Sequence, residues 1–262
     1  MGYETVSVER EGYVGVLTLS RPDRMNTFST QLARDLNDAL RDLDADADVR
    51  AVVVEGAGRA FSAGIDLSEY EPGERQRDYR NWVAAMEEPF RTLAEMATPV
   101  VAAAHGHAAA NGIGLVAACD LAVLAEGTML GATAPKVGLF CMGPAVPLMR
   151  SLTQKRCLEL LLTGDLVDAE TAVEWGLANR VVPATDLRAE AVALAERIAE
   201  KSPVAVQIGK EAYYAMADLG YDAALDYSNE RFATLCTTAD AEAGIAAFLD
   251  GEALDAAAWP GE

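Results

Sequence analysis

Basic residues are scarce in this chain of 262 residues. Lysine and arginine together number 21 against 41 aspartates and glutamates, which gives a formal net charge of −20 at pH 7 and a pI of about 4.4. Nucleic acid is bound through a basic face that neutralises its phosphates, and anionic membrane surfaces attract basic residues for the same reason. The acidic excess therefore argues against nucleic-acid and membrane partners, and it indicates a solvated acidic surface.

Cysteine and histidine are also few. The chain has four cysteines and two histidines, and none of the cysteines form a CxxC pair. We expect buried, reduced thiols rather than a disulfide framework or a metal site. The histidines flank Gly106, where a packed, hydrogen-bonded ring is favoured over a catalytic one. The residues concerned are Cys119, Cys141, Cys157, Cys236, His105 and His107.

Long uncharged apolar runs are absent too. A bilayer-spanning helix needs about 20 predominantly apolar residues, and no such stretch occurs. The N-terminus lacks the basic segment followed by an apolar one that is typical of a secretory signal. We therefore expect a cytoplasmic protein, and its 51% hydrophobic residues are enough to form a sizeable core.

Strands alternate with helices in the first two thirds of the chain, and helices dominate the last third. This order predicts a largely parallel sheet with helical crossovers. The predicted strands are Thr5–Val8, Val14–Leu19, Ala51–Glu55, Val100–Ala104, Leu121–Ala125 and Ala178–Val182. The predicted helices are Thr30–Asp44 with Ser29 as N-cap, a helix ending near Met96, Asn111–Ala118, Pro147–Leu162, Asp168–Trp175, Asp186–Lys201, Pro203–Asp218, Tyr221–Cys236 and Ala239–Leu249.

Two segments rich in small residues each follow an apolar strand. The first is Ala60–Leu67, after Ala51–Glu55, and the second is Gly106–Gly114, after Val100–Ala104. Small residues let the backbone turn sharply and approach a ligand closely. Each turn can therefore aim a peptide N–H into a cavity, and two such donors would make an oxyanion hole that stabilises a developing negative charge.

The order of these motifs resembles the enoyl-CoA hydratase/isomerase (crotonase) superfamily over nearly the whole chain. Within it, Val137–Pro144 looks like the branch called enoyl-CoA hydratase domain-containing proteins, which lacks the two catalytic glutamates. The motifs that carry the resemblance are Arg21-Pro22-x-x-x-Asn26, Ala60–Leu67, Gly106–Asp120, Leu162-Thr163-Gly164 with Ala169–Val182, and Glu242–Phe248.

The resemblance implies an α/β fold, a crotonase-like spiral of ββα units with a C-terminal helical region. Residues 1–200 would form the spiral core. Residues 201–262 would form the helical region, which takes part in trimerisation or covers an active site. A homotrimer or a dimer of trimers is implied as the assembly.

The resemblance also implies an acyl-CoA thioester as ligand, with coenzyme A carried as part of the substrate and no separate cofactor. The thioester oxygen would accept hydrogen bonds from the peptide N–H groups of Ile65 and Asn111. Arg24 and Arg59 fall where basic residues face the CoA phosphates, for which guanidinium is well suited; ordinary surface arginines are the alternative. The positions matched to CoA binding are Arg24, Arg59, Ala63, Ile65 and Leu67.

Carboxylates are missing at the three positions where members of the superfamily place catalytic ones. Gly114 and Lys136 stand where the hydratases have two glutamates, and the third position falls near Pro144. Hydration needs one group to activate water and another to deliver a proton to Cα. The resemblance therefore does not extend to standard two-glutamate hydration.

The residues present leave several roles open. Lys136 is a surface or structural lysine, an electrostatic partner for an anionic acyl group or an enolate, or a general acid or base. Asp66 is interpreted as a helix cap rather than a base, and Cys141 as a wall of the acyl pocket. Four residues are candidate proton donors because they lie in the region that often closes over the acyl group: Glu69, Tyr70, Glu87 and Glu88.

These observations predict a crotonase-family lyase or isomerase that acts on an acyl-CoA and stabilises a thioester enolate. Decarboxylation of a malonyl-CoA-type thioester is one reaction, because departure of CO₂ itself generates the enolate and no base is needed. Isomerisation, or hydration that uses an unrecognised acid, is another. The alternative from a different class is a non-catalytic acyl-CoA-binding or assembly protein.

Overall fold

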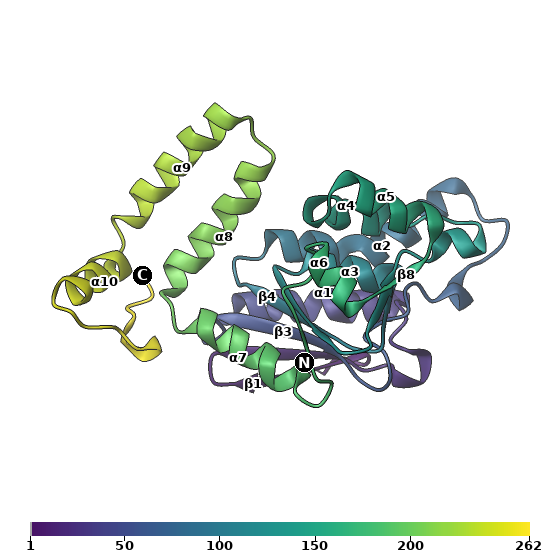
Figure 1. The fold of residues 1–262 in the computed structure, drawn as a ribbon, viewed down its shortest axis with the longest axis horizontal. Helices are drawn as coiled ribbons and strands as arrows, with labels where there is room; N and C mark the ends of the chain where they lie inside the picture. Colours follow the sequence, from purple (N-terminus) through teal and green to yellow (C-terminus); the bar gives the residue numbers. More distant parts are fainter. Residues whose placement is uncertain (1) are drawn as a thin grey trace.

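The main sheet is largely parallel, as predicted. The computed structural model describes residues 2–262, and its main sheet has six strands in the order β1-β2-β3-β4-β6-β9 (Figure 1). β1 and β2 pair as an antiparallel hairpin, and the other neighbouring pairs are parallel. The strands are β1 (Val6–Glu11), β2 (Val14–Leu19), β3 (Ala51–Gly56), β4 (Val100–Ala104), β6 (Leu121–Ala125) and β9 (Arg180–Val182).

A second, smaller sheet lies beside the main one. It has three strands in the order β5-β7-β8, in which β5 and β7 are parallel and β7 and β8 antiparallel. Its strand β5 lies inside the second turn of small residues, so this sheet fixes the course of that turn. The strands are β5 (His107–Ala109), β7 (Met129–Gly131) and β8 (Leu166–Asp168).

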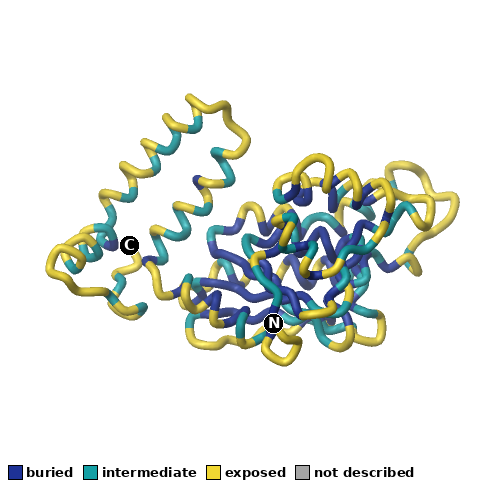
Figure 2. Tube along the Cα trace, in the orientation of Figure 1, coloured by how far each residue is buried: buried dark blue, intermediate teal, exposed yellow. Residues whose placement is uncertain are grey.

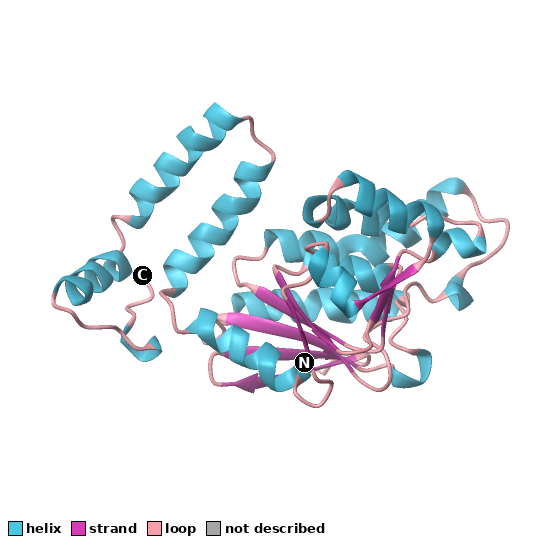
Figure 3. Cartoon of the chain, in the orientation of Figure 1, coloured by secondary structure: helices cyan, strands magenta, loops and turns pink. Residues whose placement is uncertain are grey.

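Helices make up most of the rest of the chain (Figure 3). The α-helices are α1 (Thr30–Ala45), α2 (Gln76–Glu95), α3 (Asn111–Ala118), α4 (Met142–Ser151), α5 (Gln154–Thr163), α6 (Ala169–Glu174), α7 (Leu187–Ala199), α8 (Pro203–Ala217), α9 (Tyr221–Leu235) and α10 (Ala239–Leu249). Short 3-10 helices are η1 (Pro22–Arg24), η2 (Leu67–Glu69), η3 (Ala134–Val137) and η4 (Ala256–Ala258). The Ser29 hydroxyl caps α1 by accepting from the N–H of Leu32, as predicted.

Both faces of the main sheet are covered by helices. Along β3, Val52 and Val54 join the apolar cluster under α1, α2 and α3, while Val53 joins a second cluster beneath α7. Successive side chains of a strand point to opposite faces, so burial on both sides explains why β3 reads as an unbroken apolar run. The sheet is therefore a packed platform for the turns that leave β3 and β4.

Helices α8, α9 and α10 extend away from the sheet (Figure 1), and few of their residues are buried (Figure 2). Within residues 2–262, no helix is long and apolar enough to cross a membrane. The division of the chain near residue 200 stays a prediction. Large apolar side chains exposed on this arm are Tyr213, Tyr221, Leu225, Phe232, Ile245, Phe248 and Leu249.

One buried ion pair fastens α8 to the sheet. The Nζ atom of Lys210 lies 2.8 Å from Oδ2 of Asp120, and the two side chains are only 7% and 16% exposed. Asp120 also accepts hydrogen bonds from the N–H of Val100 and the hydroxyl of Tyr214, and Lys210 donates to the carbonyl of Thr98. The aspartate that ends the Gly106–Asp120 motif therefore holds α8 at the beginnings of β4 and β6.

The structure corrects several predicted elements. The helix predicted at Pro147–Leu162 is two helices, α4 and α5, because the backbone is extended at Leu152 and Thr153. Apolar residues continue at helical spacing across this break, so the pattern conceals it. The strands β5, β7 and β8 have three residues each, too few to show an alternating pattern. Cys236 is exposed rather than buried, whereas the other three cysteines are buried.

Candidate active site

Asn26 joins the segment after β2 to the connection between β3 and the first turn of small residues. Its side chain is fully buried. Its Oδ1 accepts from the N–H of Arg21 at 2.8 Å, and its Nδ2 donates to the carbonyls of Ala57 at 2.9 Å and Ala60 at 2.8 Å. Its backbone φ is 50°, a left-handed conformation in which asparagine is enriched. These bonds explain why this motif carries asparagine.

Asp66 closes the same turn as a cap. Its carboxylate accepts from the N–H and the hydroxyl of Ser68, and it pairs with the guanidinium of Arg21 at 2.9 Å. Burial alone would raise the pKa of Asp66, but the hydrogen bonds from Ser68 and Arg21 outweigh burial and hold that pKa below its ordinary value. The predicted capping role is confirmed, and the carboxylate stays ionised at neutral pH.

The peptide N–H of Ile65 points away from the strand-like segment at Phe28. The N–H of Phe28 donates to the carbonyl of Gly64 at 2.7 Å, and the N–H of Asp66 donates to the carbonyl of Phe28 at 2.8 Å. Successive N–H groups of an extended segment point to opposite sides. The N–H of Ile65 therefore faces the other way, and it has no hydrogen-bond partner within residues 2–262.

The N–H of Asn111 is the first of helix α3. The first N–H groups of a helix lack partners in their own helix, and the helix dipole makes this end positive. This N–H too has no partner in the described part of the chain. The residue before it, Ala110, has φ 47° and ψ −113°, which a residue with a Cβ rarely adopts. Its N–H bonds to the carbonyl of Gly131 at 2.9 Å, so the second sheet holds this strained peptide in place.

The two turns are in direct contact. The carbonyl of Ser62 accepts a hydrogen bond from the second turn at 2.9 Å. A Cβ at Gly64 would lie 2.7 Å from the Cβ of Ala110, so only glycine fits there. Because Ile65 follows Gly64 and Asn111 follows Ala110, the two N–H groups without partners come from adjoining points of the chain.

Arg24 and Arg59 lie on two neighbouring segments at the rim of the first turn. Both side chains are exposed. Their segments approach closely, since a Cβ at Gly58 would lie 2.7 Å from the Cβ of Pro22. Neither guanidinium is ion-paired with a carboxylate in the part of the chain that the structure describes. Two uncompensated arginines on a protein of net charge −20 form a local anion-attracting rim.

The remaining residues matched to CoA binding continue along this turn. Leu67 is 46% exposed at the start of η2, and Ala63 and Ile65 are partly buried. The N–H of Ala63 donates to the carbonyl of Met25 at 3.0 Å, so that donor is already engaged. The rim therefore offers an apolar surface beside the arginines.

The histidines and Cys141 have ordinary surroundings. A ring nitrogen of His105 lies 2.9 Å from the carbonyl of Gly58, which agrees with the packed, hydrogen-bonded interpretation. That interpretation is wrong for His107, whose side chain is exposed. Cys141 is buried directly before α4, and burial raises the pKa of its thiol. A protonated thiol is a poor nucleophile, so Cys141 offers packing rather than thiolate chemistry.

Gly114 faces space that is already filled. It lies one turn after Asn111 on α3. A Cβ at this position would lie 2.9 Å from Cζ of Phe90 and 3.0 Å from Cβ of Pro144. A glutamate at position 114 therefore does not fit unless the Phe90 ring moves. The loss of this carboxylate is part of the packing of the site.

Lys136 turns towards solvent. Its side chain is 52% exposed, and its Nζ lies 3.9 Å from Oδ1 of Asp165. Its Cγ would be 3.5 Å from a Cβ at Gly164, which places the side chain at the connection between α5 and β8. An exposed ion pair of this kind contributes about 0–1 kcal/mol. The placement favours the surface interpretation of Lys136 over the electrostatic and acid–base ones.

Three of the four candidate proton donors are engaged elsewhere. Glu69 accepts hydrogen bonds from the backbone and hydroxyl at the start of α1. Glu88 lies 3.2 Å from the guanidinium of Arg41. Tyr70 is 45% exposed and stacks on Tyr79 with ring centroids 5.4 Å apart. Only Glu87 is left without such a contact among the described residues.

Glu87 lies over the first turn of α4. Its Oε1 and Cδ occupy the place where a side chain at Gly143 would begin. The residue is partly buried, and its carboxylate has no ion pair or hydrogen bond within residues 2–262. Burial raises the pKa of Glu87. A partly desolvated carboxyl thus lies close to Pro144, near which the third carboxylate position has no carboxylate.

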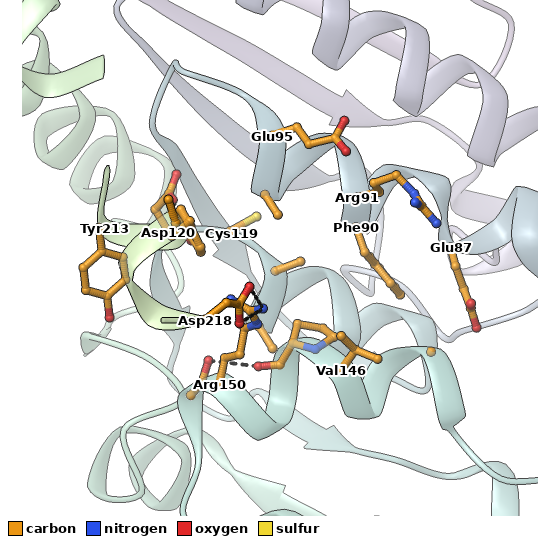
Figure 4. Close-up of a pocket in the computed structure, with 18 of the residues that line it drawn as sticks. Glu87, Phe90, Arg91, Glu95, Cys119, Asp120, Val146, Arg150, Tyr213 and Asp218 are labelled. Atoms are coloured by element: carbon orange, nitrogen blue, oxygen red, sulfur yellow. Dashed lines mark hydrogen bonds and ion pairs between the residues drawn. The ribbon is translucent and has the colours of Figure 1, made fainter. Parts of the chain in front are cut away.

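A cavity of 860 Å³ runs between α2, α3, α4 and α8 (Figure 4). Glu87 and Phe90 lie at one end of it and Tyr213 at the other, with Asp218 and Arg150 between them. Neither of the two N–H groups without partners lines it. The backbone geometry, rather than this cavity, therefore locates the candidate thioester site. At the Glu87 end of the cavity, the Phe90 ring lies against Gly114 on α3.

Comparison with known proteins places the chain in a family. A model of the family "Enoyl-CoA hydratase/isomerase" matches residues 9–255. The chain belongs to the enoyl-CoA hydratase/isomerase family. It is 39% identical over 248 residues to a Thermus thermophilus protein named "Putative enoyl-CoA hydratase", covering 94% of this chain and 97% of that protein. It is 33% identical to the human mitochondrial "Enoyl-CoA hydratase domain-containing protein 3", covering 89% of this chain and 77% of that protein.

Solved structures of this family share the fold. The enoyl-CoA hydratase of Mycobacterium smegmatis superposes with a TM-score of 0.92 at 33% identity, covering 96% of this chain and 98% of that chain. The human domain-containing protein 3 superposes with a TM-score of 0.90 at 31% identity, covering 95% and 98%. The crotonase fold predicted from the motifs is therefore confirmed.

Sequence reasoning alone does not reveal two features of this family member's site. The plugging of Gly114 by Phe90 and Pro144 depends on contacts between three elements distant in sequence. Glu87 stands out because the other three candidate proton donors have hydrogen bonds, an ion pair or a stacked ring, and these are contacts between different elements of the fold. One signal is present in the sequence: Glu87 and Phe90 are three residues apart on α2, a spacing that places both side chains on the same face of that helix.

Proposed function

We propose that this enoyl-CoA hydratase/isomerase family member binds an acyl-CoA thioester and stabilises its enolate with the peptide N–H groups of Ile65 and Asn111. The observation that carries the proposal is that these two groups have no hydrogen-bond partner among residues 2–262 and come from adjoining turns. One well-placed donor lowers the barrier by about 3–4 kcal/mol. The proposal applies to any reaction that places negative charge on the thioester oxygen.

The surroundings of the two donors support chemistry other than two-glutamate hydration. Position 114 has no room for a carboxylate, and Lys136 is directed at Asp165. Decarboxylation needs no base, because loss of CO₂ leaves the electron pair that forms the enolate. Isomerisation needs a single group to carry a proton between two carbons. We propose a lyase or isomerase reaction of one of these kinds.

Incubation of the protein with a panel of acyl-CoA thioesters, including malonyl-CoA and 3-enoyl-CoA compounds, tests this proposal by mass spectrometry of the products. Turnover of at least one substrate is expected, and turnover of none would contradict the enzymatic proposal. Tight binding by calorimetry without turnover would instead favour a non-catalytic acyl-CoA-binding protein. The observation that favours this alternative is the filled space at Gly114, which leaves no room for a catalytic carboxylate there.

A pair of substitutions at one position tests the backbone donor. Asn111→Ala removes the side chain and keeps the N–H, whereas Asn111→Pro removes the N–H at a helix position where proline is common. We expect turnover to survive the first change and to fall by roughly 10²-fold or more after the second. Circular dichroism of both variants checks that α3 remains folded, and equal turnover would contradict a role for this donor.

The arginine rim supports binding of the CoA phosphates. Replacing Arg24 and Arg59 together by alanine is expected to weaken CoA binding and to reduce its dependence on salt, because fewer charges then meet the phosphates. Arg34→Ala removes an exposed arginine from α1 and serves as the control. Calorimetry at low and moderate salt measures both effects, and equal affinity of the double variant and the control would remove these residues from the site.

We also propose that the chain assembles as a homotrimer or a dimer of trimers. The exposed apolar side chains of α8, α9 and α10 support a buried role for this arm in an assembly. Light scattering after size-exclusion chromatography would measure the mass, and a monomer at micromolar concentration would contradict this.

A further inference from the structure

Glu87 is held beside the start of helix α3 by its neighbours on α2. The carbonyl of Met86 accepts a hydrogen bond from Nδ2 of Asn111 at 3.5 Å. One turn later, the ring of Phe90 meets Gly114. An α-helix has 3.6 residues per turn, so both contacts lie within about one turn of Glu87. The contacts on either side of the glutamate therefore reach the helix that supplies an oxyanion donor.

The space for the Glu87 carboxylate is created by a glycine. Its Oε1, Cδ and Cγ lie where a side chain at Gly143 would start, so any larger residue would displace the carboxylate. Gly143 precedes Pro144, which is the third position where the family carboxylate is missing. A carboxylate from α2 thus occupies the region that the usual elements leave without one.

We propose that Glu87 is a catalytic residue that transfers the proton at Cα of the bound acyl thioester. The proposal rests on the proposed function, because it needs an enolate held by the N–H groups of Ile65 and Asn111. The carboxyl has no competing partner among the described residues. Its partial burial favours the protonated form, which brings the pKa of Glu87 closer to the range useful for proton transfer.

The step is a reversible proton transfer. A carboxylate oxygen of Glu87 takes the Cα proton, the C–H electron pair becomes the Cα=C1 double bond, and the carbonyl π pair moves to the thioester oxygen. In a 3-enoyl thioester, the protonated carboxyl then returns the proton to Cγ. The electron pairs shift to give the 2-enoyl thioester, and Glu87 is again a carboxylate. A single carboxyl completes this cycle, so the proposed substrate class is the 3-enoyl-CoA thioesters.

Several charged side chains line the same cavity and could influence the titration of this group. None of them forms an ion pair with Glu87 among the described residues. They are Arg91, Glu95, Asp120, Arg150, Glu211 and Asp218.

Deuterium exchange at Cα tests the role of Glu87. Wild-type protein is incubated with butyryl-CoA in D₂O, and mass spectrometry follows uptake of deuterium. Glu87→Gln is expected to slow exchange by roughly 10²-fold or more, and Gly143→Ala to slow it too, because its Cβ displaces the carboxylate. Glu88→Gln removes the neighbouring carboxylate, which is paired with Arg41 and Arg91, and should leave exchange unchanged.

The pH profile separates a catalytic from a structural role. The wild-type exchange rate should rise with pH through the titration of Glu87, and Glu87→Asp should keep part of the activity with an altered pH midpoint. Exchange at the wild-type rate in Glu87→Gln would overturn the role of Glu87 and leave the proposed function standing. Absence of exchange in a wild-type protein that still decarboxylates malonyl-CoA would do the same. Absence of both reactions would overturn the proposed function as well.

Discussion

Gly114 offers the sharpest test of why this site lacks a family glutamate. Gly114→Ala adds one Cβ that would lie 2.9 Å from Cζ of Phe90 and 3.0 Å from Cβ of Pro144. Overpacking of a filled site costs about 1–3 kcal/mol, and replacing a helical glycine by alanine returns about 0.5–1 kcal/mol. We expect a net loss of about 1 kcal/mol in the free energy of unfolding.

Gly209 is the matched control. It lies inside α8, and no atom lies within 4 Å of an added Cβ. Gly209→Ala should therefore stabilise the protein by about 0.5–1 kcal/mol. Urea denaturation gives both free energies, and their difference should be about 1–3 kcal/mol, the overpacking term alone. Equal effects of the two substitutions would refute the steric account of Gly114.

Shortening the ring provides a second check. Phe90→Leu removes the atom nearest the added Cβ, so the loss from Gly114→Ala should shrink by about 0.5–2 kcal/mol in the double variant. An unchanged loss would also contradict the steric account. Gly114→Glu adds a buried carboxyl group without a partner, which costs at least about 1–3 kcal/mol more even when it is protonated. We therefore expect that Gly114→Glu combined with Lys136→Glu does not produce crotonyl-CoA hydration, which is measured by loss of the enoyl absorbance.

Three further substitutions test the packing and electrostatics around the site. Ala110→Gly relieves a backbone strain of about 1–3 kcal/mol against an entropic cost of about 0.5–1 kcal/mol, so the unfolding free energy should rise by roughly 1 kcal/mol; a fall would contradict the strain. Lys210→Met leaves the buried Asp120 charge without its partner and should lower the free energy of unfolding by about 3–5 kcal/mol. Lys201→Met, at an exposed site, should change it by less than about 0.5 kcal/mol. Equal effects of the two in denaturation would contradict the anchoring role of Lys210. Burial raises the pKa of Glu87 in the folded state, so its contribution to stability is present below its ordinary pKa and is lost as pH rises through the raised value. Glu87→Gln should therefore gain thermal stability relative to wild type between pH 4 and pH 8, and a constant difference in melting temperature would contradict the burial effect.

The sequence predicts the main features of the fold because they depend on local patterns. The apolar runs of β3 and β4 and the Ser29 cap are each visible within a few residues. The break between α4 and α5 escapes prediction because apolar spacing continues through Leu152. The three-residue strands of the second sheet exist because of their partners, and a single sequence does not show these.

The candidate site divides in the same way. The two turns are predicted because small residues at fixed spacing determine where the backbone can bend. Whether a carboxylate is free for chemistry depends instead on the side chains and backbone groups that it contacts in the folded protein. Glu69 accepts hydrogen bonds at the start of α1 and Glu88 pairs with Arg41, while the Glu87 carboxylate lies against Gly143 and has no ion pair or hydrogen bond within residues 2–262. These contacts join α2 to α1 and α4, and no local pattern encodes them.

The contrast between backbone donors and side-chain acids explains how such a site can change its reaction. The N–H groups of Ile65 and Asn111 are fixed by strand pairing and by a helix start, so side-chain substitution leaves them in place. A carboxylate can be lost at Gly114 and gained from α2 without disturbing either donor. In the proposed function, enolate stabilisation is thus the part of the chemistry that the fold preserves, and the proton-transfer group is the part that can move. On this reasoning, the position of the free carboxylate, rather than family membership, decides which acyl-CoA reaction to test first.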